Sequence, residues 1–114
     1  MQQPIQLTFR NIPESPALKN LVLDEAEELE HFYDRITHCR VLVEAPHQKH
    51  AKGNLYHVTI HLTVPGKTLV VTRNPNEHFS HRDCYLAIRE AFHEMRRQLQ
   101  DFIRIQRSPV KMIY

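Results

Sequence analysis

The sequence predicts an α+β fold, a two-layer sandwich in which a four-stranded sheet carries two helices on one face. Apolar residues alternate with polar ones over 5–10 and, most clearly, over 56–64, as in strands with one buried face. Over 16–33 and 83–107 they recur every three or four residues, as in amphipathic helices. With two further strands the order is β-α-β-β-β-α, and the two helices can bury the apolar face of one sheet.

The first helix begins at a strong start signal. Ser15 can cap its N-terminus, and Pro16 suits the first helical position. The apolar stripe of this helix ends at Phe32 or Tyr33. The outer face of the helix is acidic and carries Asp24, Glu25, Glu27, Glu28 and Glu30. We expect this face to point away from any polyanionic partner.

The three remaining strands are expected at 39–44, 56–64 and 68–73. A polar loop, 47–54, joins the first two of them and carries Lys52. Pro65-Gly66-Lys67 predicts a tight turn that joins the last two as an antiparallel hairpin. The polar face of the middle strand should stay exposed to water, and it carries His57, Thr59 and His61.

The final helix, 83–107, follows a predicted capping box at Ser80-His81-Arg82-Asp83. Its side chains fall into three stripes. The apolar stripe contains Tyr85, Ile88, Phe92, Met95, Leu99 and Phe102. The basic stripe contains Arg89, His93, Arg96, Arg97, Arg104 and Arg107. The acidic stripe contains Glu90, Glu94 and Asp101. We predict that the basic stripe meets an anionic partner; the alternative is a solvated face whose arginines pair with these acids.

The composition is that of one globular domain, expected at 1–107 with a short tail at 108–114. The 114 residues carry a formal net charge of +2, which is mildly basic. No apolar run is long enough to span a bilayer, and no secretory signal is visible, so we expect a cytoplasmic protein. Cys39 and Cys84 form no Cys-x-x-Cys motif, which indicates two reduced thiols.

The motifs of enzymes and of metal sites are missing. His81-Arg82-Asp83 matches the start of a kinase catalytic loop, but Ile88 stands where that loop needs asparagine. No nucleotide-binding, hydrolase or metalloprotease motif is present. The nine histidines show no usual ligand spacing, and His57 and His61 are too far apart to chelate one ion. We therefore predict no enzymatic activity, no metal or other cofactor and no small-molecule substrate.

Three segments carry a family resemblance. The end of the first helix reads Leu29-Glu30-His31-Phe32-Tyr33-Asp34-Arg35-Ile36. The last helix reads Asp83-Cys84-Tyr85-Leu86-Ala87-Ile88 and, nine residues after Ile88, Arg97-Gln98-Leu99. These segments resemble the ribosome hibernation-promoting factor family, also called the sigma-54 modulation family, which includes ribosome-associated translation inhibitors.

The resemblance implies a non-enzymatic protein that binds the small ribosomal subunit and its 16S-type rRNA. In stress or stationary phase such proteins occupy the channel for mRNA and tRNA at the decoding region and block translation. The resemblance implies an RNA contact for Arg97 and supports Arg89, Arg96 and Arg104. Longer family members add a C-terminal domain that pairs ribosomes, and this sequence, which ends at Tyr114, is expected to lack it.

The sequence departs from the family pattern at two kinds of position. Glu94 and Asp101 stand where the family commonly has lysine, so we expect weaker or rearranged contacts with RNA. The loop 74–82 is longer and richer in histidine than is usual in the family.

Charge pattern and resemblance together predict an RNA-binding surface in which arginines neutralise rRNA phosphates and lysines stand at the loop rims. Its predicted residues are Arg73, Arg82, Arg89, Arg96, Arg97, Arg104, Lys67 and Lys52. An alternative function is a double-stranded-RNA-binding-like regulatory module not specific to ribosomes, since that class shares the sandwich. A third is a histidine-dependent metal-binding protein, which stoichiometric zinc surviving dialysis would support.

Overall fold

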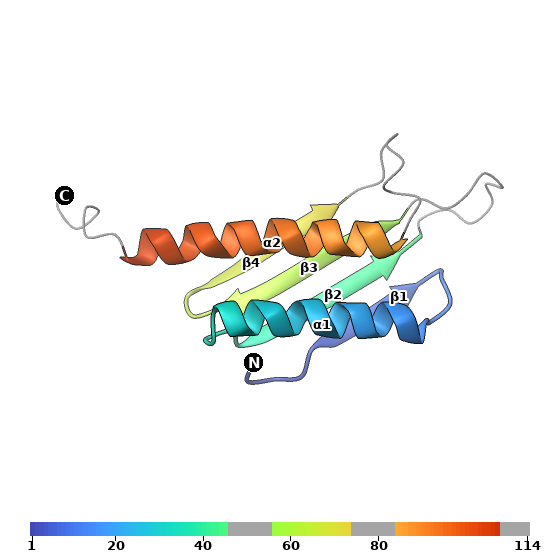
Figure 1. Cartoon of the computed structure of the whole chain (residues 1–114), viewed down its shortest axis with the longest axis horizontal. Coiled ribbons are helices and arrows are strands. Elements are labelled where there is room, and N and C mark those ends of the chain that lie inside the picture. The colour runs from blue at the N-terminus through green and yellow to red at the C-terminus, as the bar shows by residue number, and fades with distance from the viewer. Residues whose placement is uncertain (46–55, 74–83, 108–114) are drawn as a thin grey trace.

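The computed structural model describes residues 1–45, 56–73 and 84–107, and it confirms the predicted α+β order (Figure 1). The elements are β1 (Gln6–Arg10), α1 (Pro16–Phe32), β2 (His38–Glu44), β3 (His57–Val64), β4 (Lys67–Arg73) and α2 (Cys84–Arg107). Within the described residues, predicted and observed boundaries differ by single residues, which is the usual uncertainty of element ends. The predicted capping box at 80–83 lies outside the described residues.

The sheet has the strand order β1-β2-β3-β4, so strands that follow one another in the sequence are neighbours. β1 and β2 are parallel because α1 provides the crossover between them, whereas the other two pairs are antiparallel. Val41 pairs with Leu7 of β1 on one side and with Ile60 of β3 on the other. This register lines up the apolar residues of adjacent strands on one face.

The turn between β3 and β4 is tighter than predicted. Val64 pairs with Lys67, so Lys67 is the first residue of β4 and only Pro65 and Gly66 lie in the turn. Proline fixes φ near the value that the first turn position needs, and Gly66 has a φ of 84°, as in a type II turn. Glycine is suited to this second position because it adopts positive φ without steric cost.

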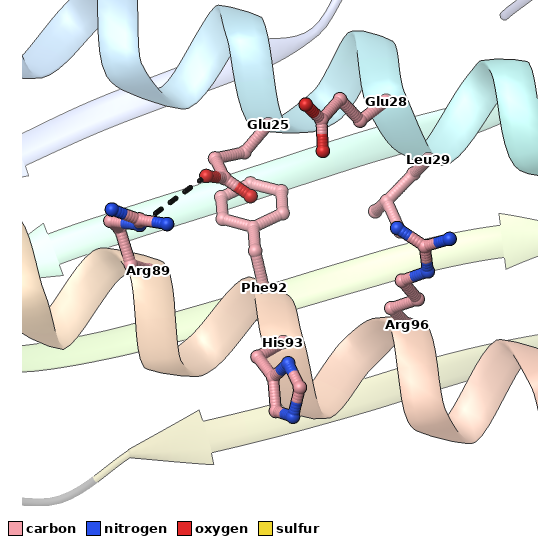
Figure 2. Close-up of a pocket in the computed structure, with 7 residues that line it drawn as sticks. All are labelled: Glu25, Glu28, Leu29, Arg89, Phe92, His93 and Arg96. Carbon is pink, nitrogen blue, oxygen red and sulfur yellow. Dashed lines mark ion pairs between the residues drawn. The ribbon is translucent and has the colours of Figure 1, made fainter.

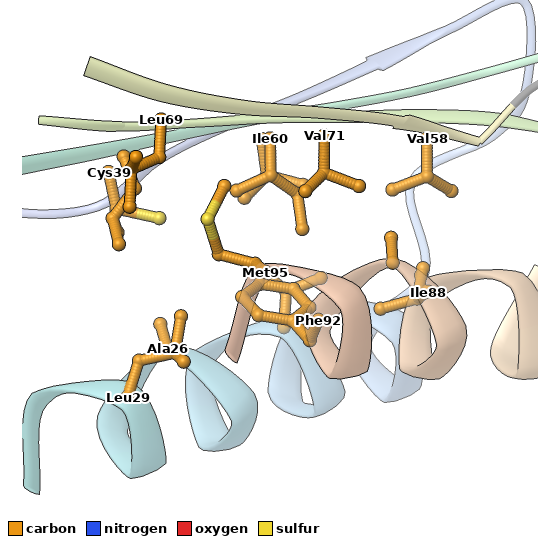
Figure 3. Close-up of a cluster of buried hydrophobic side chains, with 14 of the residues drawn as sticks. Ala26, Leu29, Cys39, Val58, Ile60, Leu69, Val71, Ile88, Phe92 and Met95 are labelled. Carbon is orange, nitrogen blue, oxygen red and sulfur yellow. The ribbon is translucent and has the colours of Figure 1, made fainter. Parts of the chain in front are cut away.

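The hydrophobic core lies between the sheet and the two helices, which cover the same face (Figures 1 and 3). Every second residue of β3 is buried, and these are Val58, Ile60, Leu62 and Val64. From the helices, Leu29 of α1 and the Phe92, Met95 and Leu99 side chains of α2 reach into the same core. The opposite sheet face, including the polar face predicted on β3, is covered by no helix of the described structure.

Two members of the predicted apolar stripe of α2 are not fully buried: Phe102 is half-buried, and Tyr85 is exposed. Tyr85 is 46% exposed, whereas Ala87 and Ala91 are completely buried. Tyr85 lies in the first turn of α2, at the edge of the apolar arc, so it escapes the core. The small Ala87 and Ala91 instead occupy the side of α2 that faces the sheet and allow the helix to approach the sheet closely.

Neither helix of the described part has the length and apolar composition that a membrane span needs.

Candidate nucleic-acid interface

α2 presents its basic residues on the side that faces away from the core. One flank of α2 packs against α1 and the other against β4 (Figure 1). Between the flanks, Arg89, Arg96, Arg97 and Arg104 are all exposed. We call these four residues the arginine arc. The structure thus brings four of the predicted RNA-binding residues onto one surface of one rigid element.

The flank of α2 beside β4 is fixed by polar contacts. An Arg73 guanidinium nitrogen lies 3.3 Å from a carboxylate oxygen of Glu90. The Gln98 side chain donates a hydrogen bond to the carbonyl oxygen of Val70, also at 3.3 Å. Arg73 is a predicted RNA-binding residue, and the structure shows that it also joins the end of β4 to α2.

Along the arginine arc, acids and bases alternate in a chain of contacts that we call the ion-pair chain (Glu94, Arg97, Asp101, Arg104). Arg97 hydrogen-bonds to both carboxylate oxygens of Glu94, at 3.2 and 2.5 Å. It also lies 3.6 Å from Asp101, which in turn pairs with Arg104 at 2.9 Å. The alternative prediction was a solvated face whose arginines pair with acids of the same helix, and these contacts are such pairs. The surface predicted to bind an anionic partner is therefore also the surface that carries the intrahelical pairs.

The ion-pair chain leaves its arginines available to other anions. The hydrogen bond from Arg97 lowers the pKa of Glu94, and the same contact raises the pKa of Arg97, so both groups stay charged near neutral pH. The pairs are solvent-exposed, and exposed ion pairs contribute little net stability. A phosphate group can therefore replace a carboxylate of the ion-pair chain as the partner of an arginine, with little loss of stability.

The other flank of the arginine arc meets α1. Arg89 lies 3.8 Å from Glu25 of α1, and the Arg96 guanidinium lies over the ring of Phe32, 5.0 Å from its centroid. Burial, and next the nearby carboxylate of Glu28, raises the pKa of Glu25, although Arg89 acts in the opposite direction. Arg96 gains a cation–π contact in place of a carboxylate partner.

A groove runs between the two helices at this flank, with a cavity volume of about 200 Å³ (Figure 2). We call it the interhelical groove, and its lining residues are Glu25, Glu28, Leu29, Arg89, Phe92, His93 and Arg96. The groove thus brings Glu25 and Glu28 of the acidic face of α1 beside Arg89 and Arg96, while the expectation that this face points away from a polyanionic partner stays a prediction. This proximity depends on how α1 packs against α2, and the residue pattern of a single helix does not specify that packing.

The other predicted RNA-binding residues do not join the arginine arc. Lys67 lies at the start of β4, at the opposite end of that strand from Arg73. Arg82 and Lys52 lie outside the described residues. Within the described residues, the structure thus divides the predicted site into the arc on α2 and the two ends of β4.

Phe32 is a functional candidate that the sequence pattern did not reveal. Its helical spacing places it with Tyr33 as a choice for the core stripe, but Phe32 is 37% exposed and contacts Arg96 instead. Tyr33 packs against the core and makes an edge-to-face contact with Phe102 of α2. The sequence did contain a signal: the apolar stripe could end at either Phe32 or Tyr33, so one of the two aromatic side chains was free to lie outside the core.

The described residues include no group of three or more histidines, cysteines and acids that could hold a metal ion. His57 is 4.0 Å from Glu44 on the open sheet face. The loop histidines, His47, His50, His78 and His81, lie outside the described residues, so the metal hypothesis stays a prediction for them.

Two solved structures show the same fold. A ribosomal subunit interface protein from Coxiella burnetii superposes with a TM-score of 0.68 at 20% sequence identity, over 86% of this chain and 94% of that chain. The N-terminal domain of Protein Y from Thermus thermophilus gives a TM-score of 0.64 at 20% identity, over 85% of this chain and 94% of that chain. A comparison with curated proteins found no match.

The sequence itself matches the family described as sigma 54 modulation protein / S30EA ribosomal protein over residues 5–106. This range includes β1, α1, α2 up to its last residue but one, and all the segments on which the resemblance rests, so the resemblance is confirmed. The chain therefore belongs to the sigma 54 modulation / S30EA ribosomal protein family, a family of non-enzymatic, ribosome-associated hibernation factors and translation inhibitors.

Proposed function

We propose that this protein binds the small ribosomal subunit through rRNA near the decoding region and inhibits translation by occupying that site under stress or in stationary phase. Family membership supports the ribosome as partner, and a structural relative is itself described as a ribosomal subunit interface protein. The observation that carries the proposal is the arginine arc, because four exposed guanidinium groups on one helix suit a surface of closely spaced phosphates. A ribosomal partner also places the protein in the cytoplasm.

The arginine arc would bind by electrostatics rather than by sequence readout. Arginine presents several donors in a planar fork, and contacts to phosphate position a protein on RNA without reading bases. RNA phosphates would compete with Glu94 and Asp101 for Arg97 and Arg104. Arg73 and Lys67, at the two ends of β4, would add further contacts, as would Arg82 and Lys52. The whole domain 1–107 would form one binding unit with 108–114 as its tail.

Sedimentation with separated ribosomal subunits tests this function. The protein should pellet with small subunits at low salt and much less with large subunits. If the four arginines of the arc neutralise four phosphates, raising the salt from 50 to 200 mM should weaken binding roughly a hundredfold. Equal binding to both subunits, or binding that is insensitive to salt, would contradict the proposal.

Competition separates this function from general binding of double-stranded RNA. Free RNA duplex at a concentration equal to that of the subunits should leave the protein in the small-subunit fraction. If the duplex removes the protein from the subunits, the alternative of a regulatory module without ribosome specificity is correct.

A further inference from the structure

The interhelical groove has walls of opposite charge. Glu25 and Glu28 project from α1, whereas Arg89 and Arg96 project from α2 (Figure 2). Two apolar side chains, Leu29 and Phe92, lie at the floor between them, and they are only 2% and 1% exposed. A ligand in this groove would meet hydrogen-bond acceptors on one side and planar guanidinium groups on the other.

The two ends of the groove differ in whether their charged side chains are already paired. At one end the ion pair between Arg89 and Glu25 occupies both side chains. At the other end Glu28 has no hydrogen-bond or ion-pair partner within residues 1–45, 56–73 and 84–107, so both of its carboxylate oxygens can accept. Arg96 reaches across from α2 toward Leu29, and its contact with Phe32 orients the guanidinium while the side chain stays exposed.

The size of the groove limits what can enter it. Its volume of about 200 Å³ is below the range of roughly 300–1,000 Å³ typical of pockets for drug-sized ligands. A single planar base fits such a space, but a whole nucleotide does not. The sugar and phosphates of the same nucleotide would lie outside the groove, beside the arginine arc. His93 would also lie near them, because it points away from α1 (Figure 2).

The two oxygens of a carboxylate can distinguish guanine from the other three RNA bases, because both oxygens accept hydrogen bonds. Guanine alone has two adjacent donors on its Watson–Crick edge, N1–H and the N2 amino group, and one carboxylate can accept from both. Adenine and cytosine offer one amino group beside an acceptor, and uracil offers one N–H between two carbonyl groups. Unpaired bases are also commonly stacked on arginine guanidinium planes.

We propose that the interhelical groove binds one unpaired guanine of an RNA strand, with Glu28 accepting from N1–H and N2–H and Arg96 stacking on the base. This inference rests on the proposed binding of ribosomal RNA and deepens it, because it adds base readout to an interface otherwise based on phosphate contacts. Phe32 is a positioning residue in this arrangement, since it acts through Arg96.

Short single-stranded RNAs test the proposal. Binding of the full chain to nine-residue oligouridines with guanine, inosine or adenine at the central position is measured by fluorescence anisotropy at low salt. We expect the guanine oligomer to bind about tenfold more tightly than the adenine oligomer. Inosine lacks the N2 amino group but keeps N1–H, so its affinity should be intermediate.

Two variants with the same change in charge assign the preference to the groove. Glu28→Gln should bring the ratio of guanine to adenine affinity close to one. Glu27→Gln should keep the parental ratio, because Glu27 lines a different cavity, beside the N-terminal segment. Both side chains are exposed, so neither variant should unfold the protein.

Three results would overturn the proposal: equal affinity of the parent for guanine and adenine oligomers, a guanine preference that survives Glu28→Gln, or no measurable binding to any oligomer. Such a failure is separable from failure of the proposed function. A protein that sediments with small subunits but shows no guanine preference retains the function and loses this inference.

Discussion

Single residues decide how strongly the arginine arc attracts phosphate. Arg97 is held by Glu94 and Asp101, and Arg104 is held by Asp101, so two carboxylates compete directly with RNA for two arginines. Arg96 has an aromatic partner instead of an acid. The affinity for RNA therefore depends on the two acids as much as on the arginines themselves.

Removing these carboxylates should strengthen RNA binding. Glu94→Gln with Asp101→Asn should raise the affinity for small subunits roughly two- to fivefold per carboxylate, because exposed pairs of this kind are weak competitors. Sedimentation at several salt concentrations measures the change. Glu14→Gln with Glu27→Gln is the control of equal charge, since both acids are exposed and neither belongs to α2. In an Arg97→Gln background the gain from Glu94→Gln should disappear; a gain that persists would mean that net charge alone is responsible.

The two cysteines should differ in reactivity. Cys39 is completely buried, and burial raises the pKa of its thiol to about 12, whereas Cys84 is only half-buried. Since the thiolate is the reactive form, one thiol per chain should react rapidly with an aromatic disulfide reagent at pH 8, and two should react after denaturation. Cys84→Ser should abolish the rapid phase. Two rapidly reacting thiols in the native protein would show that the core around Cys39 is open.

The stability of the protein should depend on the protonation of Glu25. Its pKa is raised above the ordinary value of 4.5 by burial and by Glu28, so the folded chain holds this proton more tightly than the unfolded chain does. Ionised Glu25 therefore lowers stability at neutral pH, and this loss disappears below the unfolded pKa. Relative to the parent, Glu25→Gln should gain stability as the pH rises from about 4 to about 7, measured by urea unfolding. A loss over the same range would mean that the pair with Arg89 dominates.

At the scale of elements, the start of α1 depends on its cap. The Ser15 hydroxyl accepts a hydrogen bond from the backbone N–H of Leu18 at 3.3 Å, and Pro16 follows it. Ser15→Ala should lower the free energy of unfolding by about 1 kcal/mol, as measured by urea denaturation. Ser15→Asp keeps a capping oxygen and should be close to the parent. Equal stability of the Ala and Asp variants would contradict a capping role.

The strands and helices were predictable because each follows a local period. The alternation from Val58 to Val64 specifies a strand with one buried face, and the spacing of Ile88, Phe92, Met95 and Leu99 specifies a buried helix stripe. The exposed exception, Tyr85, lies where the helix has just begun. Periodicity locates a residue on a face but does not say where along the helix the core ends.

The contacts between elements were not predictable in the same way. Glu25 and Arg89 are 64 residues apart, as are Phe32 and Arg96, and their meeting depends on how α1 and α2 pack. The sequence pattern correctly grouped the arginines of α2, because they belong to one helix. It did not reveal that Glu25 lies beside them, because a helical wheel carries no information about the neighbouring helix.

At the scale of the whole molecule, the described residues form surfaces of different charge. The outer side of α1 carries exposed acids such as Asp24 and Glu27, the arginine arc occupies α2, and the open sheet face mixes histidine, threonine and arginine. An anionic partner should therefore approach over α2, close to the interhelical groove. The proposed orientation on rRNA follows from this distribution, not from the small net charge.

Reversal of charge on the arginine arc tests the central claim most directly. Arg96→Glu with Arg97→Glu is compared with Lys19→Glu with Arg40→Glu, which makes the same change in charge at exposed residues of α1 and of the open sheet face. In sedimentation at low salt, the arc variant should no longer pellet with small ribosomal subunits, and the control variant should pellet with them as the parent does. If the arc variant pellets with small subunits as well as the parent does, the arginine arc is not the ribosome-binding surface.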